Sequence, residues 1–313
     1  MFDVRRAALV VAVLIAGGSV ATIVPAQAQQ QARPAQDPDL RAAIGKSNAY
    51  TGLLNRTLRA IESWERYTSW VNLKTGPTGR ERYITYGLYS LYDVRDEIQR
   101  ARIAIDAPPS SPELDAAMKR YIEAYEALAP VITQAYGYYE RKDYKADNMA
   151  EGKALHVKLA PAAETFLRER KQVDALFRPF KLQLDLRELA ALEVAEGKNA
   201  AWHIKYVMIQ ARNVVEILPT GAQPVANMQA LDDAIARYAA AVKDVDAWAL
   251  ENPGKLSSFA GRPSSWLGKL REFRDKLARA RGDARRSAGN DLTWITNDYN
   301  MMVSMSDMAG RMR

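Results

Sequence analysis

The sequence contains no cysteine and only two histidines in 313 residues. Without cysteine there is no thiol nucleophile, no zinc–thiolate site, no iron–sulfur cluster and no lipid attached through a cysteine. The two histidines, His156 and His203, are too few for a multi-histidine metal site. We therefore expect neither a cofactor nor a bound metal, and we expect packing alone to stabilise the fold.

Glycine and proline are also scarce, with 17 and 14 residues, while 48% of the chain is hydrophobic and 26% is charged. This composition is typical of an ordinary globular protein and argues against disorder or a collagen-like repeat. The length allows one large domain or two smaller ones with a real core.

The first 28 residues have the pattern of a secretory signal. Arg5 and Arg6 form a basic start, residues 7–24 are apolar, and small residues surround a cleavage position at Ala28. We expect cleavage there, a disordered tail over 29–37, and a periplasmic protein that is not a lipoprotein because it has no cysteine. The alternative is an uncleaved anchor, since eighteen apolar residues are the low end for spanning a bilayer.

Apolar residues recur at steps of three or four through most of the remaining chain, which is the period of an amphipathic helix. The clearest stripe runs through Leu114, Met118, Tyr121, Tyr125, Leu128, Ile132, Ala135 and Tyr139. We expect Pro130 to kink this helix, and Pro161 and Pro179 to bend or divide a later one.

Breaks that contain glycine or proline separate the periodic stretches. They predict helices near 38–73, 80–106, 112–142, 147–196, 199–218, 225–251, 264–286 and 290–309. The predicted fold class is therefore all-α: an elongated antiparallel helical bundle of about eight helices with no significant sheet. We expect a single domain over residues 38–313.

Several short motifs suggest relatives. They are Tyr138–Asp147 followed by Gly152-Lys153-Ala154-Leu155-His156, Trp70 with Gly76-Pro77-Thr78-Gly79, Tyr86-Gly87-Leu88-Tyr89, Glu196-Gly197-Lys198 ahead of His203, and Tyr299-Asn300. In this order they resemble the YiiG-like family of bacterial envelope proteins. The resemblance implies an exported helical protein of unknown function, and the family has no established catalytic or ligand residues. Several members carry a lipid-anchoring cysteine, which this chain lacks.

One candidate ligand site lies between Tyr136 and His156, where polar and aromatic residues gather near a helix junction. The candidate binding residues are Tyr139, Tyr144, Asp147, Lys153 and His156. The tyrosines can line a groove for a sugar or a peptide. In the alternative interpretation Tyr139 continues the core stripe, Asp147 caps the next helix, Tyr144 packs the turn, and His156 is hydrogen-bonded inside the bundle.

A second candidate is a basic stretch, in which residues 269–286 carry eight basic and three acidic side chains. We take Arg271, Arg274, Arg279 and Arg281 as candidate contacts with an anionic surface, such as lipid headgroups or an acidic envelope glycan. The alternative is a solvated helix face whose acids and bases form spaced pairs.

No nucleophile, base and orienting group occur in a recognisable combination. Gly45-Lys46-Ser47 imitates the end of a phosphate-binding loop, but Leu40 stands where its first glycine would be. We therefore expect a non-enzymatic periplasmic interaction or ligand-binding module. Its partner would be an envelope protein or a small ligand, with no nucleic acid and at most a weak contact with an anionic membrane.

Two other functions stay open. One is a hydrolase or lyase that acts on an envelope polymer, with Asp143, Asp147 or His156 as acid or base. The other is a peripheral membrane protein that docks through the basic helix 264–286.

Overall fold

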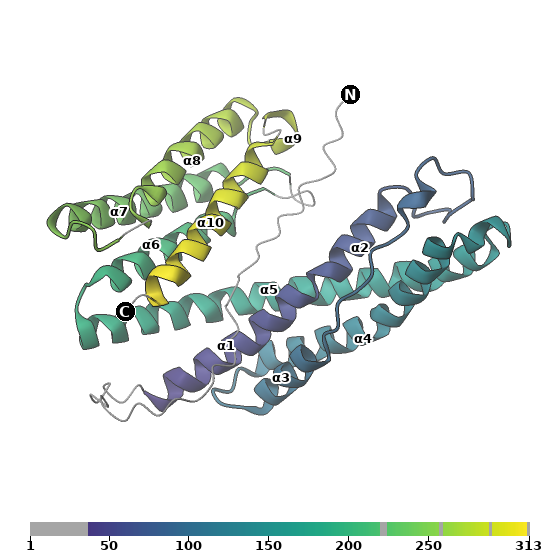
Figure 1. The fold of residues 1–313 in the computed structure, drawn as a ribbon, viewed down its shortest axis with the longest axis horizontal. Coiled ribbons are helices and arrows are strands. Elements are labelled where there is room, and N and C mark those ends of the chain that lie inside the picture. Colours follow the sequence, from purple (N-terminus) through teal and green to yellow (C-terminus); the bar gives the residue numbers. More distant parts are fainter. Residues whose placement is uncertain (1–36, 220–223, 257–258, 288–289, 312–313) are drawn as a thin grey trace. The chain divides into compact units, whose positions relative to one another are not determined.

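The computed structural model describes residues 37–311 apart from 220–223, 257–258 and 288–289 (Figure 1). The expected signal over residues 1–28 and nearly all of the expected tail lie outside the described residues. In the described part of the chain every regular element is a helix, apart from an isolated bridge between Val225 and Asp283. The predicted all-α class is confirmed. None of the described helices is both long and apolar enough to span a bilayer.

The described chain divides into two compact units. We call Asp37–Leu184 the N-terminal unit and the residues from Asp185 onward the C-terminal unit. Helix α5 (Ala150–Glu196) contributes residues to both. The single domain expected over residues 38–313 stays a prediction.

The N-terminal unit consists of α1 (Pro38–Arg56), α2 (Leu58–Thr68), α3 (Arg95–Asp106), α4 (Pro112–Arg141) and the first part of α5, with two short 3-10 turns, η1 (Ile84–Tyr86) and η2 (Asp143–Lys145). The periodic stripe predicted on α4 is buried throughout and packs against Tyr50, Tyr67 and Phe166. Helix α5 continues without interruption through Pro161 and Pro179, so the expected division does not occur. Buried Leu159 and Phe166 lie on either side of Pro161 and hold the flanking turns in the core.

A buried ion pair joins α1 to α4. The Lys46 ammonium lies 2.9 and 2.8 Å from the two carboxylate oxygens of Asp115, and the Tyr50 hydroxyl donates to the same carboxylate over 2.5 Å. The Ser111 backbone N–H donates to it as well, over 2.9 Å. Since Lys46 is 1% exposed and lies within a helix, Gly45-Lys46-Ser47 is part of the core and not a phosphate loop.

The helix predicted over residues 80–106 is wrong in its first half, because α3 begins only at Arg95. Residues 87–94 have no regular secondary structure, and Gly87 has a positive φ of 52° that interrupts a helix. Leu88 and Val94 are nevertheless buried, as their spacing predicted. Side chains of α2 replace the helical hydrogen bonds, and the Ser63 hydroxyl both donates to the Tyr89 carbonyl and accepts from its N–H.

The C-terminal unit contains the rest of α5 with α6 (Ala200–Val215), α7 (Met228–Glu251), α8 (Arg262–Arg279), α9 (Ala284–Ser287) and α10 (Asp291–Arg311). Helices α6 and α8 each contact both α7 and α10. Trp266, Tyr238 and Phe273 form the centre of the core, where the Trp266 indole N–H donates to the Ile295 carbonyl. The helix predicted over 264–286 is too long, since α8 ends at Arg279 and a separate short α9 follows.

Candidate functional site

The end of α8 positions two arginines. Its apolar face, with Phe273 and Leu277, is buried, and the helix stops where the Gly282 N–H bonds back to the Leu277 carbonyl over 2.7 Å. Arg281 supplies the left-handed residue that this type of helix ending requires, with a φ of 54°. Glycine normally occupies that position because a side chain there is strained. The fold therefore holds an arginine where a glycine would be less costly.

The loop that carries Arg281 is fixed by a second loop of the same unit. The Ala226 N–H donates to the Gly282 carbonyl and the Ala284 N–H donates to the Pro224 carbonyl, each over 2.9 Å. Gly282 has a φ of 83°, and a Cβ there would lie 3.0 Å from the Ala226 carbonyl oxygen. Both the conformation and the close approach require glycine at this position.

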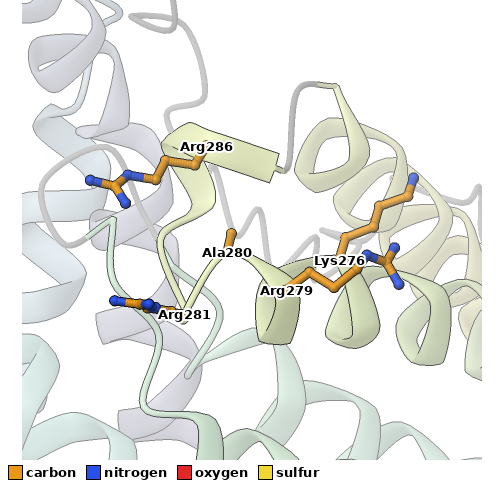
Figure 2. Close-up of a pocket in the computed structure, with 5 residues that line it drawn as sticks. All are labelled: Lys276, Arg279, Ala280, Arg281 and Arg286. Carbon is orange, nitrogen blue, oxygen red and sulfur yellow. The ribbon is translucent and has the colours of Figure 1, made fainter.

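A depression of about 780 Å³ lies at this helix end (Figure 2). It is lined by four basic residues and one small one: Lys276, Arg279, Ala280, Arg281 and Arg286. Figure 2 shows Arg281 and Arg286 extending to one side of the loop, while Lys276 and Arg279 extend to the other. The depression therefore has a cationic group on each flank and no acidic side chain in its lining.

Acidic neighbours neutralise two of these four cations. Lys276 pairs with Asp291 over 2.7 Å, and Arg286 lies 3.4 Å from Asp283. Among the described residues, Arg279 and Arg281 form no ion pair. The hydrogen bonds from Arg285 lower the pKa of Asp283, so this carboxylate stays charged near neutral pH.

The attraction of these cations for an anion exceeds the repulsion from the C-terminal end of α8. A helix C-terminus disfavours a bound anion by roughly 0.3–1 kcal/mol. Each basic group favours contact with an anionic surface by about 1 kcal/mol. With two unpaired arginines and two partly neutralised cations, the depression is suited to phosphate or carboxylate groups, which guanidinium binds through paired hydrogen bonds.

The four arginines predicted to contact an anionic surface do not act together. Arg279 and Arg281 line the depression, whereas Arg274 makes two hydrogen bonds to Asp232, of 2.6 and 2.7 Å, that raise its pKa. Arg271 lines a separate shallow groove between α7 and α8. The sequence reasoning missed Lys276 and Arg286 as lining residues. Gly282 was the available signal, because it marks the turn that brings α9 back toward α8.

The two tyrosines of the predicted groove are buried in the core. Tyr139 is 4% and Tyr144 is 9% exposed, and the Tyr139 ring packs edge-on against Trp70 with centroids 5.1 Å apart. This burial counts against a groove lined by these two rings. Lys153 is exposed on the first turns of α5.

His156 takes part in a buried hydrogen-bond chain. Its Nε2 lies 3.2 Å from the Leu73 carbonyl oxygen, and its Nδ1 lies 3.0 Å from the Tyr67 hydroxyl. Since a carbonyl only accepts, Nε2 carries the proton and Nδ1 accepts from Tyr67. The Tyr67 ring lies beside that of Tyr139, with centroids 6.3 Å apart, and burial raises the pKa of both phenols. Both imidazole nitrogens are therefore engaged in structure.

Asp147 holds the turn at the start of α5. One carboxylate oxygen accepts from the Met149 N–H and the Tyr138 hydroxyl, and the other accepts from the Glu151 N–H over 2.9 Å. These bonds, the one from the Glu151 N–H foremost, lower the pKa of Asp147. Four of the five residues predicted around this junction thus have structural roles: Asp147 caps the turn, and Tyr139, Tyr144 and His156 are buried. Lys153 is exposed. The described chain gathers no three His, Asp or Glu side chains as a metal site.

Comparison with known proteins places the chain among uncharacterised relatives. Over 177 residues it is 28% identical to the uncharacterised protein YiiG of Escherichia coli strain K12, a match that covers 55% of this chain and 50% of that protein. The chain thus spans about half the length of this curated relative. No solved structure matches it. Residues 42–304 match the family described as a protein of unknown function, DUF3829. The chain therefore belongs to the DUF3829 family, the YiiG-like family that its motifs resemble.

Proposed function

We propose that this chain is an exported, non-enzymatic binding protein whose C-terminal unit holds a phosphate-bearing ligand in the cationic depression at the end of α8. The observation that carries the proposal is the lining of that depression, which contains four basic side chains and no acidic one. Export rests on the secretory pattern in residues 1–28.

The arrangement of the cations favours a ligand with more than one negative group. Arg281 and Arg286 point to one side of the loop and Lys276 and Arg279 to the other, so the cations form two pairs that face different sides (Figure 2). A diphosphate or a row of lipid headgroups presents two or more anionic groups, one for each pair of cations. Guanidinium groups bind each phosphate through two parallel hydrogen bonds.

We favour binding over catalysis because the candidate acid and base side chains already form hydrogen bonds or ion pairs within the fold. His156 has both ring nitrogens hydrogen-bonded, and both carboxylate oxygens of Asp147 accept backbone N–H groups. Asp143 pairs with Arg141 over 2.7 Å. A general acid or base needs a free position facing its substrate.

The test measures binding of inorganic pyrophosphate by calorimetry, and of phosphatidylglycerol vesicles by sedimentation. We expect the paired variant Arg279→Glu with Arg281→Glu to weaken binding by more than an order of magnitude, since each lost contact is worth about 1 kcal/mol, or about fivefold. The control Arg271→Glu reverses one arginine on α8, the helix that also carries Arg279, but outside the depression. It should have a much smaller effect.

The two probes distinguish the sources of phosphate. Pyrophosphate binding without vesicle binding identifies a soluble ligand, and vesicle binding that is lost in moderate salt identifies a membrane surface. If the control weakens binding as much as the paired variant, or if neither probe binds, the depression is not the site.

A further inference from the structure

A partly exposed row of alternating guanidinium groups and tyrosine rings runs along the N-terminal unit. Its members, which we call the Arg–Tyr ladder, are in order Arg56, Tyr92, Arg59, Tyr89, Arg66 and Tyr86. Successive guanidinium carbons and ring centroids are 4.7, 5.6, 3.9, 4.2 and 5.6 Å apart. Tyr83 extends the row by stacking on Tyr86 with centroids 5.1 Å apart.

The ladder fastens residues 86–93 to the ends of α1 and α2. The Nε atoms of Arg56, Arg59 and Arg66 donate to the carbonyl groups of Asp93, Ser90 and Tyr86, in that order. The arginine numbers rise while the carbonyl numbers fall, so the segment runs antiparallel to the helices. This fastening uses only the Nε atoms of the arginines and the faces of the rings.

The fastening leaves the outer edges of the ladder to solvent. Tyr92 is 50% and Tyr86 is 37% exposed. One terminal nitrogen of Arg59 bonds to Glu62 over 2.8 Å, whereas Arg56 and Arg66 form no ion pair among the described residues. The outer edge of the ladder therefore presents phenol hydroxyls and guanidinium N–H groups in alternation, at spacings of 3.9–5.6 Å.

The charge around the ladder decides which ligand it suits. Residues 56–97, which contain the ladder, have seven basic and six acidic side chains, so this segment is close to neutral. A polyanion gains little long-range attraction from such a balance. A row of phenol hydroxyls and guanidinium N–H groups instead matches a ligand that offers many uncharged hydroxyl groups.

We propose that the Arg–Tyr ladder is a binding surface for an extended, uncharged glycan strand, which lies along the row and hydrogen-bonds to its outer edge. Successive ladder members are separated by roughly the rise of one sugar along such a strand, so neighbouring sugars can each meet one guanidinium or one phenol. The surface lies in the N-terminal unit and is independent of the cationic depression.

The test is calorimetric titration of the whole protein with chitohexaose and cellohexaose, and with polygalacturonate as an acidic polymer. We expect at least one uncharged oligosaccharide to bind, and Tyr86→Ala with Tyr92→Ala to lose at least tenfold in affinity. Trp294→Ala is the matched control, because Trp294 is 61% exposed on α10 in the C-terminal unit. Its affinity should equal that of the parent protein.

A second double variant distinguishes a loss of binding from a folding defect. Tyr86→Phe with Tyr92→Phe keeps both rings and removes only the exposed hydroxyls, so the fastened segment stays in place. We expect an affinity reduced about threefold to tenfold, with an unchanged unfolding temperature. The proposal is overturned if no uncharged oligosaccharide binds, if only polygalacturonate binds, or if both tyrosine pairs bind as well as the parent.

Discussion

Replacement of Arg281 by glycine should make the protein more stable while weakening its hold on anions. Arg281 has a φ of 54°, and a left-handed conformation costs a residue with a Cβ roughly 1–2 kcal/mol. Glycine removes that strain, but it loses about 0.5–1 kcal/mol through the greater freedom of the unfolded chain. The midpoints of these two ranges give a net gain of about 0.75 kcal/mol, which corresponds to a rise in Tm of about 1–3 °C for a protein of this size.

Urea unfolding followed by far-ultraviolet circular dichroism measures this gain, and pyrophosphate titration measures the loss of binding. We expect affinity to fall about fivefold, the value of one lost cationic contact. Arg279→Gly is the matched control, because Arg279 is the last residue of α8 and lines the same depression without a left-handed backbone. It should weaken binding equally and lower stability.

Two results would refute this reasoning. A loss of stability in Arg281→Gly would mean that the backbone at this position is not strained. A gain in stability with unchanged affinity would mean that the arginine side chain does not serve anion binding. The comparison between the two glycine variants separates backbone strain from side-chain charge.

Three further predictions concern the N-terminal unit. Asp115→Asn should lower the free energy of unfolding by about 3–5 kcal/mol in urea titration, because it leaves the Lys46 ammonium buried without its counter-ion. Replacing Asp115 by Leu and Lys46 by Met together should restore much of this loss, and a double variant as unstable as Asp115→Asn would contradict the reasoning. Tyr67→Phe should cost about 1–3 kcal/mol by the same assay, since the Nδ1 of His156 then stays buried without a donor; a change below about 0.5 kcal/mol, as expected at an exposed site, would exclude the hydrogen bond. The pKa of Asp147 is lowered in the folded state, so the stability that its carboxylate contributes is fully present above its ordinary pKa of 3.8 and is lost as the pH falls through the lowered pKa. Acid titration of Asp147→Asn should therefore show a smaller loss of stability below pH 4 than the parent protein, and identical acid profiles would disprove the capping role.

The helical fold could be predicted from the spacing of apolar residues, because burial of one face sets that spacing. Helix α4 shows this most clearly, since the stripe from Leu114 to Tyr139 is buried as predicted. Residues 80–94 could not be predicted, although their apolar spacing is the same. Their conformation depends on side chains of α1 and α2, which periodicity within the segment cannot reveal.

The candidate site was predictable only in part. Arg279 and Arg281 were recognised from local charge, but their separation from Arg274 depends on Asp232, which lies 42 residues away along the chain. The aromatic residues around His156 were recognised as a group. Spacing alone could not decide between a groove and a core, because tyrosine serves both, and burial of Tyr139 is set by packing against Trp70.

The way in which residues 86–93 are held has a consequence for the order of folding. Their carbonyl groups are bonded by arginine, serine and tryptophan side chains of α1, α2 and the residues just after α2. Because these bonds come from other elements, we expect this stretch to take its path after those side chains are in place. Both helices precede this stretch in the sequence, so the side chains that fix its path come earlier in the chain than the stretch itself.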